Sequence, residues 1–337
     1  MSGYANRIIL SLSRGGLASV MASGILSISA FHHGFFLLSI ILYICAIVLF
    51  SVIVVPSFWL TRDLIWRNSD YRWKFNRFTF VSGIAVILSR TMIIHISPVM
   101  SYLSLVLMIS DLAAVISFLA IELSENTIGN DSSHFSQLNL GVSVAASLVA
   151  LDLGVGSASN IQSGILLLIA IFSMFLAIFL YLAFVYLNLR RFLTGNYSME
   201  NVDGTLWIAM GLPALISVSI ITTLSAFPSI TGVLLVDLDN FAEEFWVLAT
   251  CILIPVTIIS IIKVRRTERI RYHPSLWAVI FPTGVYSLDT TFLSQILLNR
   301  AIYDFSVAVD IASSSLFVVF LFLLMLTSID TNYNNQS

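Results

Sequence analysis

The sequence predicts an all-α membrane protein in which ten transmembrane helices form five helical hairpins. Of its 337 residues, 58% are hydrophobic and 10% are charged, and the mean hydropathy is +0.97. Soluble globular domains are far more polar, with about 25% charged residues. Apolar segments long enough to cross about 30 Å of hydrocarbon recur along the whole chain. These observations predict a single transmembrane domain over residues 1–337.

Ten apolar segments have the length expected of membrane-spanning helices. They are residues 13–31, 34–60, 78–95, 98–121, 138–157, 161–189, 205–227, 241–262, 274–297 and 304–328. Loops such as His32-His33 and Ile96-Ser97 are very short, so consecutive segments are expected to pair as hairpins. The hairpins begin at similar intervals along the chain, which suggests an internal pseudo-repeat of the kind found in transporters.

The basic residues indicate how the chain crosses the bilayer. Of the 16 Lys and Arg residues, all except Arg90 and Arg300 fall in the N-terminal stretch or in the loops after the second, sixth and eighth segments. Positively charged loops stay on the cytoplasmic side. Both termini are therefore expected to be cytoplasmic, in a multi-pass protein of the plasma membrane. The loop at 122–137 belongs to the same side although it contains no Lys or Arg.

Glycines distinguish the odd-numbered segments from the bulkier even-numbered ones. Interior glycines on odd segments are Gly24, Gly83, Gly141, Gly154, Gly211 and Gly284. Small residues either permit close helix packing or leave space for a permeant species. We expect the five odd helices to form an inner ring around a pore, and the five even helices to form an outer ring facing lipid.

The ninth segment combines features expected of a pore wall. Pro282 and, in the seventh segment, Pro213 each remove a backbone donor, so both helices are expected to kink. A freed carbonyl at membrane depth must face protein or a water-filled cavity. Phe281 lies at the kink and Asp289 further along. Asp289 is either tied up in a structural hydrogen bond or functional, for example in coupling protonation to anion passage.

Ionisable residues inside the bilayer are costly and usually functional. Arg90 is the one basic residue within a predicted span, where it either pairs with an acid or attracts anions. The intramembrane acids are Asp111, Asp152, Asp289 and Asp310. We expect these acids to point away from an anion pore, to pair with Arg90, or to carry protons.

Three motifs resemble the tellurite-resistance/dicarboxylate transporter family, which includes bacterial TehA, plant slow anion channels, and fungal malate and sulfite transporters. Met21-Ala22-Ser23-Gly24 is similar to the family's M-G-T-G opening, with Ala22 and Ser23 substituted. The stretch from Trp207 to Gly211 is similar to its Trp-containing segment. Residues 274–282, PSLWAVIFP, resemble its P-x-W-W-x-x-x-F-P segment, with Leu276 in place of the first Trp.

The resemblance implies a homotrimer in which each protomer has its own pore through five inner helices. It also implies a phenylalanine that closes the pore, and the matching residue is Phe281. Without the resemblance, Phe281 would be read as a core or lipid-facing residue. Thr283, Gly284 and Gly211 lie near it and would offer weak dipolar contacts to an ion, which suits conduction.

We therefore predict transport of small anions: inorganic ions, dicarboxylates such as malate, or sulfite- and tellurite-type oxyanions. The alternative is a proton-coupled organic-anion carrier. An intramembrane enzyme would need convergent His, Asp or Ser side chains, and the acids look scattered. No metal site, cofactor or nucleic-acid partner is indicated. The partners expected are small anions and membrane lipid.

Overall fold

A computed structural model describes residues 17–60, 71–94, 164–193, 206–226, 235–266 and 276–333, with 99, 102–103, 106–107, 109–110 and 112–117 between them. These residues are almost all helical, and no strand occurs among them. The predicted segment 138–157 and part of the segment 98–121 lie outside the described residues. The ten-span arrangement therefore stays a prediction.

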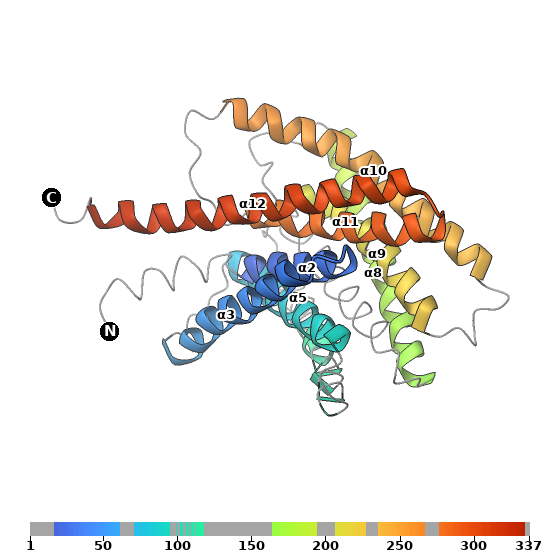
Figure 1. Cartoon of the computed structure of the whole chain (residues 1–337), viewed down its shortest axis with the longest axis horizontal. Coiled ribbons are helices and arrows are strands. Elements are labelled where there is room, and N and C mark those ends of the chain that lie inside the picture. Colours follow the sequence, from blue (N-terminus) through green and yellow to red (C-terminus); the bar gives the residue numbers. More distant parts are fainter. Residues whose placement is uncertain are drawn as a thin grey trace. The chain divides into compact units, whose positions relative to one another are not determined.

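The helices lie in the regions where apolar segments occur in the sequence (Figure 1). Their bounds are α2 Leu17–His32, α3 Phe36–Leu60, α5 Tyr71–Ile94, α8 Gly164–Leu193, α9 Leu206–Ala226, α10 Leu235–Arg266, α11 Trp277–Ile296 and α12 Arg300–Tyr333. Helix α5 begins before the predicted span, because its first turns carry the polar and basic residues of the preceding loop. Pro213 and Pro282 lie inside α9 and α11 as expected, and Pro255 lies inside α10.

The chain divides into two compact units, and the candidate site belongs to the first. The first unit contains α2, α3, α9 up to Gly211, α10 from Val247, α11 and α12. The second unit contains α5, α8 and the remaining parts of α9 and α10. Within the first unit, α2 and α3 form one antiparallel hairpin and α11 and α12 another (Figure 1). Helix α2 packs against α11 and also contacts α12.

The turn between α2 and α3 and a pair of serines hold the first hairpin together. Gly34, in the turn between α2 and α3, has a φ of +79°, a backbone conformation that residues other than Gly rarely adopt. Ser27 Oγ donates to the Ser39 carbonyl at 2.7 Å, and Ser39 Oγ donates to the Ser27 carbonyl at 2.6 Å. Both hydroxyls are thus used to clamp α2 to α3 inside an apolar protein, where an unpaired hydroxyl is costly.

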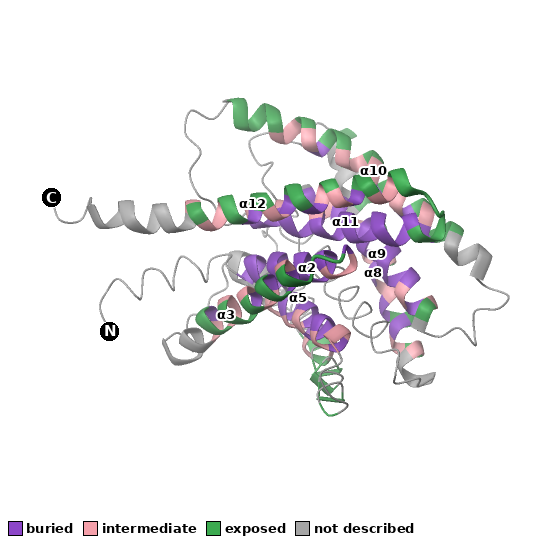
Figure 2. Cartoon of the chain, in the orientation of Figure 1, coloured by how far each residue is buried: buried purple, intermediate pink, exposed green. Residues whose placement is uncertain are grey.

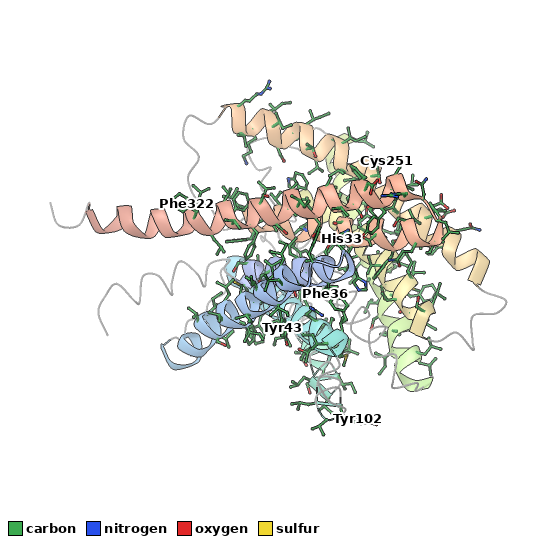
Figure 3. The ribbon with its side chains drawn as sticks, in the orientation of Figure 1. His33, Phe36, Tyr43, Tyr102, Cys251 and Phe322 are labelled. Carbon is green, nitrogen blue, oxygen red and sulfur yellow. The ribbon has the colours of Figure 1, made fainter. Side chains whose placement is uncertain are left out.

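Burial separates two kinds of helix (Figure 2). Every residue from Leu17 to Ala30 of α2 is buried, as are nearly all of α11 and most of α9. By contrast, α3, α10 and α12 expose large apolar side chains, with Phe36 and Phe322 each 59% exposed (Figure 3). This contrast follows the distinction between glycine-bearing and bulky segments, while the closed ring of five helices stays a prediction.

Within the part of the chain that the structure describes, four helices are long and apolar enough to cross a bilayer. The stretches are Phe36–Val54, Trp207–Ser225, Asn240–Arg265 and Arg300–Leu323. Shorter apolar helices occur at Leu17–His32, Thr79–Ile94 and Leu167–Ala183. Exposed apolar side chains on such long helices are suited to a hydrocarbon environment rather than to water.

Candidate functional site

Helix α11 lies deep in the first unit, and its proline lies against Gly211 of α9. Phe281 is 5% exposed and directly precedes Pro282. A Cβ atom added to Gly211 would lie 2.5 Å from the Pro282 Cβ and 2.8 Å from its Cα. Only glycine therefore fits at this crossing. Close helix packing is enough to explain why Gly211 is a glycine. A pore-lining role for Gly211 stays a prediction.

The next turn of α11 is fixed by contacts with α2 and by its own backbone. A Cβ added to Gly284 would lie 3.0 Å from Ile25 Cγ2 and 3.2 Å from Leu26 Cδ2. Thr283, which is half-buried, donates its hydroxyl to the Val279 or Ile280 carbonyl at 3.0 Å. Such back-bonding favours a bend in the helix, as Pro282 does.

Side chains of the surrounding helices secure α11 along its length. Trp277 is fully buried and its ring packs edge-on against those of Phe317 and Phe320 of α12. Tyr286 shares a 2.8 Å hydrogen bond with Thr250 of α10. Contacts of this kind position α11 between its neighbours rather than at the lipid surface.

A cluster of buried polar side chains joins the ends of α2 and α11 to α12. His33 directly follows α2, where α2 lies against α11 and α12 (Figure 3). Its Nε2 is 2.8 Å from Thr291 Oγ1 and 3.0 Å from Ser306 Oγ. Its Nδ1 is 3.6 Å from Asp310 Oδ2, and both side chains are fully buried. Ser287 Oγ of α11 donates to the Ser306 carbonyl at 2.8 Å.

This cluster corrects the expectation that no His, Asp and Ser converge inside the protein. Asp310, His33 and Ser306 follow the carboxylate–imidazole–hydroxyl order of hydrolytic triads. However, Ser306 Oγ is 2.7 Å from the Tyr303 carbonyl and the residue is 0% exposed. A nucleophile must reach its substrate, and Ser306 has no such access. The cluster is therefore suited to joining the helices and to binding a proton.

The remaining predicted residues are placed as follows. Asp289 on α11 is 0% exposed, and Gly24 on α2 is also buried. Arg90, which is 2% exposed, and the buried Gly83 lie on α5 in the second unit. An ion pair between Arg90 and one of the acids stays a prediction. Asp111 and Asp152 lie outside the described residues.

Sequence reasoning missed His33 because it falls in a short turn. Ser306, one of the residues within hydrogen-bond distance of its ring, lies 273 residues further along the chain. The one available signal was Asp310: a carboxylate in an apolar segment calls for a polar partner. That requirement does not name the partner.

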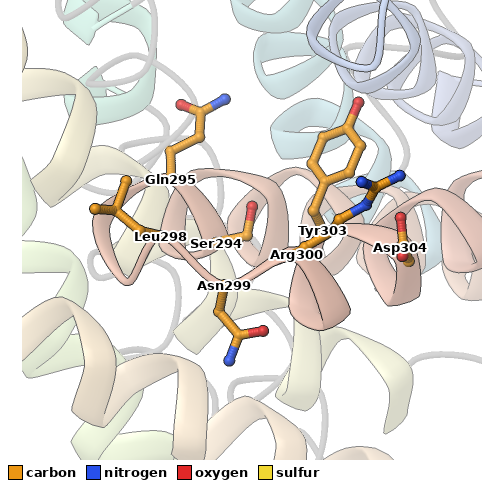
Figure 4. A pocket seen from close by; sticks show the side chains of 7 residues that line it. All are labelled: Ser294, Gln295, Leu298, Asn299, Arg300, Tyr303 and Asp304. Carbon is orange, nitrogen blue, oxygen red and sulfur yellow. The ribbon is translucent and has the colours of Figure 1, made fainter.

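An open pocket of about 390 Å³ lies at the turn between α11 and α12 (Figure 4). Its lining residues are Ser294, Gln295, Leu298, Asn299, Arg300, Tyr303 and Asp304. Asn299 caps α12 through its side-chain oxygen, which accepts from the backbone N–H of Ala301 at 3.0 Å. Because Arg300 is accompanied here by the acidic Asp304, the pocket is not a strongly positive anion site.

Long apolar helices around a buried helix with an internal proline define a helical membrane protein. A model of the SLAC1 family, described as voltage-dependent anion channel, matches residues 12–329, so the chain belongs to this family. The match confirms the predicted family and indicates anion transport across a membrane by a channel or transporter. A direct comparison with curated proteins gave no match.

Proposed function

We propose that each protomer conducts small anions through its own pore, lined by α2, α5, α9 and α11 and by the predicted segment 138–157. In this proposal Phe281 occludes the pore at the break in α11. The observation that carries it is the combination at one level of a buried phenylalanine, a helix-breaking proline and a glycine that lets α9 approach. Pro282 cannot donate a backbone hydrogen bond, which weakens α11 next to the aromatic side chain.

The interior chemistry supports weak binding of anions rather than tight capture. Helices α2, α9 and α11 carry many hydroxyl-bearing residues and no Lys, and α2 alone buries Ser19, Ser23, Ser27 and Ser29. Hydroxyl dipoles offer an anion partial positive charge without holding it strongly, and conduction requires that the ion also leave. Arg90, Gly24, Gly83, Thr283 and Gly284 are proposed to attract anions or line the path.

The proposal includes a homotrimer in the plasma membrane with both termini in the cytoplasm. The exposed apolar faces of α3, α10 and α12 support contact with lipid or with neighbouring protomers. The substrates are inorganic anions, dicarboxylates such as malate, or sulfite- and tellurite-type oxyanions.

A proton-coupled organic-anion carrier is the second candidate, and the full burial of Asp289 on α11 favours it. In this case Asp289→Asn would flatten the pH dependence of anion uptake into liposomes. Asp304→Asn is the matched control, because Asp304 is an exposed acid on α12. An unchanged pH dependence in Asp289→Asn would rule out Asp289 as the coupling group.

The experiment that tests the proposal compares chloride, nitrate and malate currents of the purified protein in planar bilayers. Step-like single-channel openings with anion over cation selectivity are expected. Saturable, pH-dependent and electrically silent uptake would favour the carrier instead. Absence of anion flux in any condition, from protein shown to be folded, would contradict both.

A further inference from the structure

The carboxylate of Asp310 is buried in a way that calls for a positive or proton-donating partner. The residue is 0% exposed, and neither of its oxygens has a hydrogen-bond partner among the described residues. The imidazole Nδ1 of His33 lies 3.6 Å from Asp310 Oδ2, at ion-pair distance. Burying a carboxylate without a compensating positive charge or hydrogen bond is strongly unfavourable. The protonation state of His33 therefore decides whether this contact is favourable.

The hydrogen bonds around Nε2 of His33 show where its first proton lies. A hydroxyl group has one proton to donate. Thr291 Oγ1 lies 2.8 Å from the Ser287 carbonyl, and Ser306 Oγ lies 2.7 Å from the Tyr303 carbonyl. The Thr291 hydroxyl also lies 3.1 Å from Ser306 Oγ, a further acceptor for its proton. With the hydroxyl protons directed at these acceptors, the oxygen lone pairs face His33, and we assign the first imidazole proton to Nε2.

Nδ1 then faces the carboxylate with a lone pair unless a further proton is present. Two acceptors facing each other at a buried position repel, whereas a proton on Nδ1 makes the contact an ion pair and a proton on the carboxylate removes its charge. We propose that His33 and Asp310 form a buried proton-binding site that joins α2 to α12, with one proton held by either the imidazole Nδ1 or the carboxylate, whose nearest atoms are 3.6 Å apart. The proton binds by forming an N–H or O–H bond at this pair and leaves to solvent when the pH rises.

The other ionisable groups near this pair are engaged elsewhere or lie at a distance from it. The ring of Tyr303 lies 5.7 Å from that of His33, and the Tyr286 hydroxyl is bonded to Thr250. Asp289 is two residues from Thr291, which puts it about 200° around α11 from the residue that contacts His33. Arg300 and Asp304 are exposed at the start of α12. The other ionisable residues of these helices and of α3 are His32, Tyr43 and Cys45, and Asp330 and Tyr333 in the last turn of α12.

Proton binding at this pair affects the packing of three helices. Ser287 of α11 donates to the Ser306 carbonyl of α12, and Ser29 of α2 donates to Ser287 Oγ at 3.3 Å. The attraction between His33 and Asp310 thus closes α2 and α12 around α11. Loss of the proton turns that contact repulsive and weakens the closure. The site stands independently of the proposed anion pore, and its test requires no flux measurement.

The test is a double-mutant cycle on the full-length protein in detergent, with His33→Gln, Asp310→Asn and the double variant. Thermal unfolding is measured at about pH 5.5 and about pH 9, which bracket the range in which an imidazole changes charge. At the lower pH each single variant should lower Tm, and the double variant should lower it by less than the sum. At the higher pH this coupling should vanish or change sign. His32→Gln, whose ring packs against Phe292, is the control and should be additive with Asp310→Asn.

Additive effects at both pH values, or equal coupling at both, would overturn the proposal. If Asp310→Asn does not fold, nitrogen-15 NMR of the histidine-labelled wild-type protein serves instead, with the His33 signal assigned through His33→Gln. The Nδ1 signal should show a bound or hydrogen-bonded proton at the lower pH and a bare lone pair at the higher pH. An Nδ1 signal that does not change with pH contradicts the site.

Discussion

Gly211 and Pro282 meet so closely that a single added methyl group would have no room. The added Cβ would lie 2.5 Å from the Pro282 Cβ, whereas the corresponding atom on Gly284 would lie 3.0 Å from Ile25 Cγ2. A proline ring next to backbone cannot move aside, but the end of an isoleucine side chain can. The crossing of α9 and α11 therefore depends on glycine at Gly211, whereas the contact of α11 with α2 tolerates alanine better at Gly284.

Gly211→Ala should destabilise the protein by about 1–3 kcal/mol, the usual cost of overpacking. Gly284→Ala is the matched control and should cost less. Thermal unfolding in one detergent, with size-exclusion profiles, measures both. Equal melting temperatures for the two variants would mean that α9 and α11 do not cross at Gly211.

The serine pair between α2 and α3 should contribute measurably to the first hairpin. Ser27→Ala and Ser39→Ala each remove one hydroxyl-to-carbonyl bond, and each should cost about 0.6 kcal/mol, the average for hydrogen bonds between membrane helices. Ser51→Ala is the control, since its exposed hydroxyl donates within α3 to the Ile47 carbonyl at 2.8 Å. A Ser51 variant as destabilised as the other two would contradict the clamp.

The bond from Trp207 to Ser260 should tie α9 to α10. Trp207 is 8% exposed, and its Nε1 donates to Ser260 Oγ at 2.9 Å. Ser260→Ala leaves the indole N–H without this acceptor and should cost about 1 kcal/mol. Combining it with Trp207→Phe tests the pairing by thermal unfolding. The double variant should lose less than the sum of the two single losses, and strict additivity would argue against the bond.

Sequence alone predicted the features that depend on local pattern. Apolar length located the helices, and glycines separated buried α2, α9 and α11 from exposed α3, α10 and α12. Proline positions within α9 and α11 also followed directly. The family match then confirmed the motif resemblance.

Features that depend on tertiary contact could not be read in this way. A glycine that serves packing and one that lines a pore look the same in a sequence, and only the contact of Gly211 with Pro282 separates them. Likewise, Asp310 signalled the need for a partner, but His33 lies at the other end of the chain. Pairing across such a separation is set by how α2 and α12 pack, which local periodicity does not specify.

The central claim is that Phe281 closes the anion path, and its most direct test is the conductance of Phe281→Ala. Phe281→Ala removes the ring and opens the space that the ring fills, while Pro282 and the rest of α11 stay in place. Chloride current per reconstituted protein in planar bilayers should rise several-fold over wild type, with Phe292→Ala, a buried phenylalanine further along α11, as the control that should not raise it. A Phe281→Ala protein that folds normally and carries no more current than wild type would contradict the account.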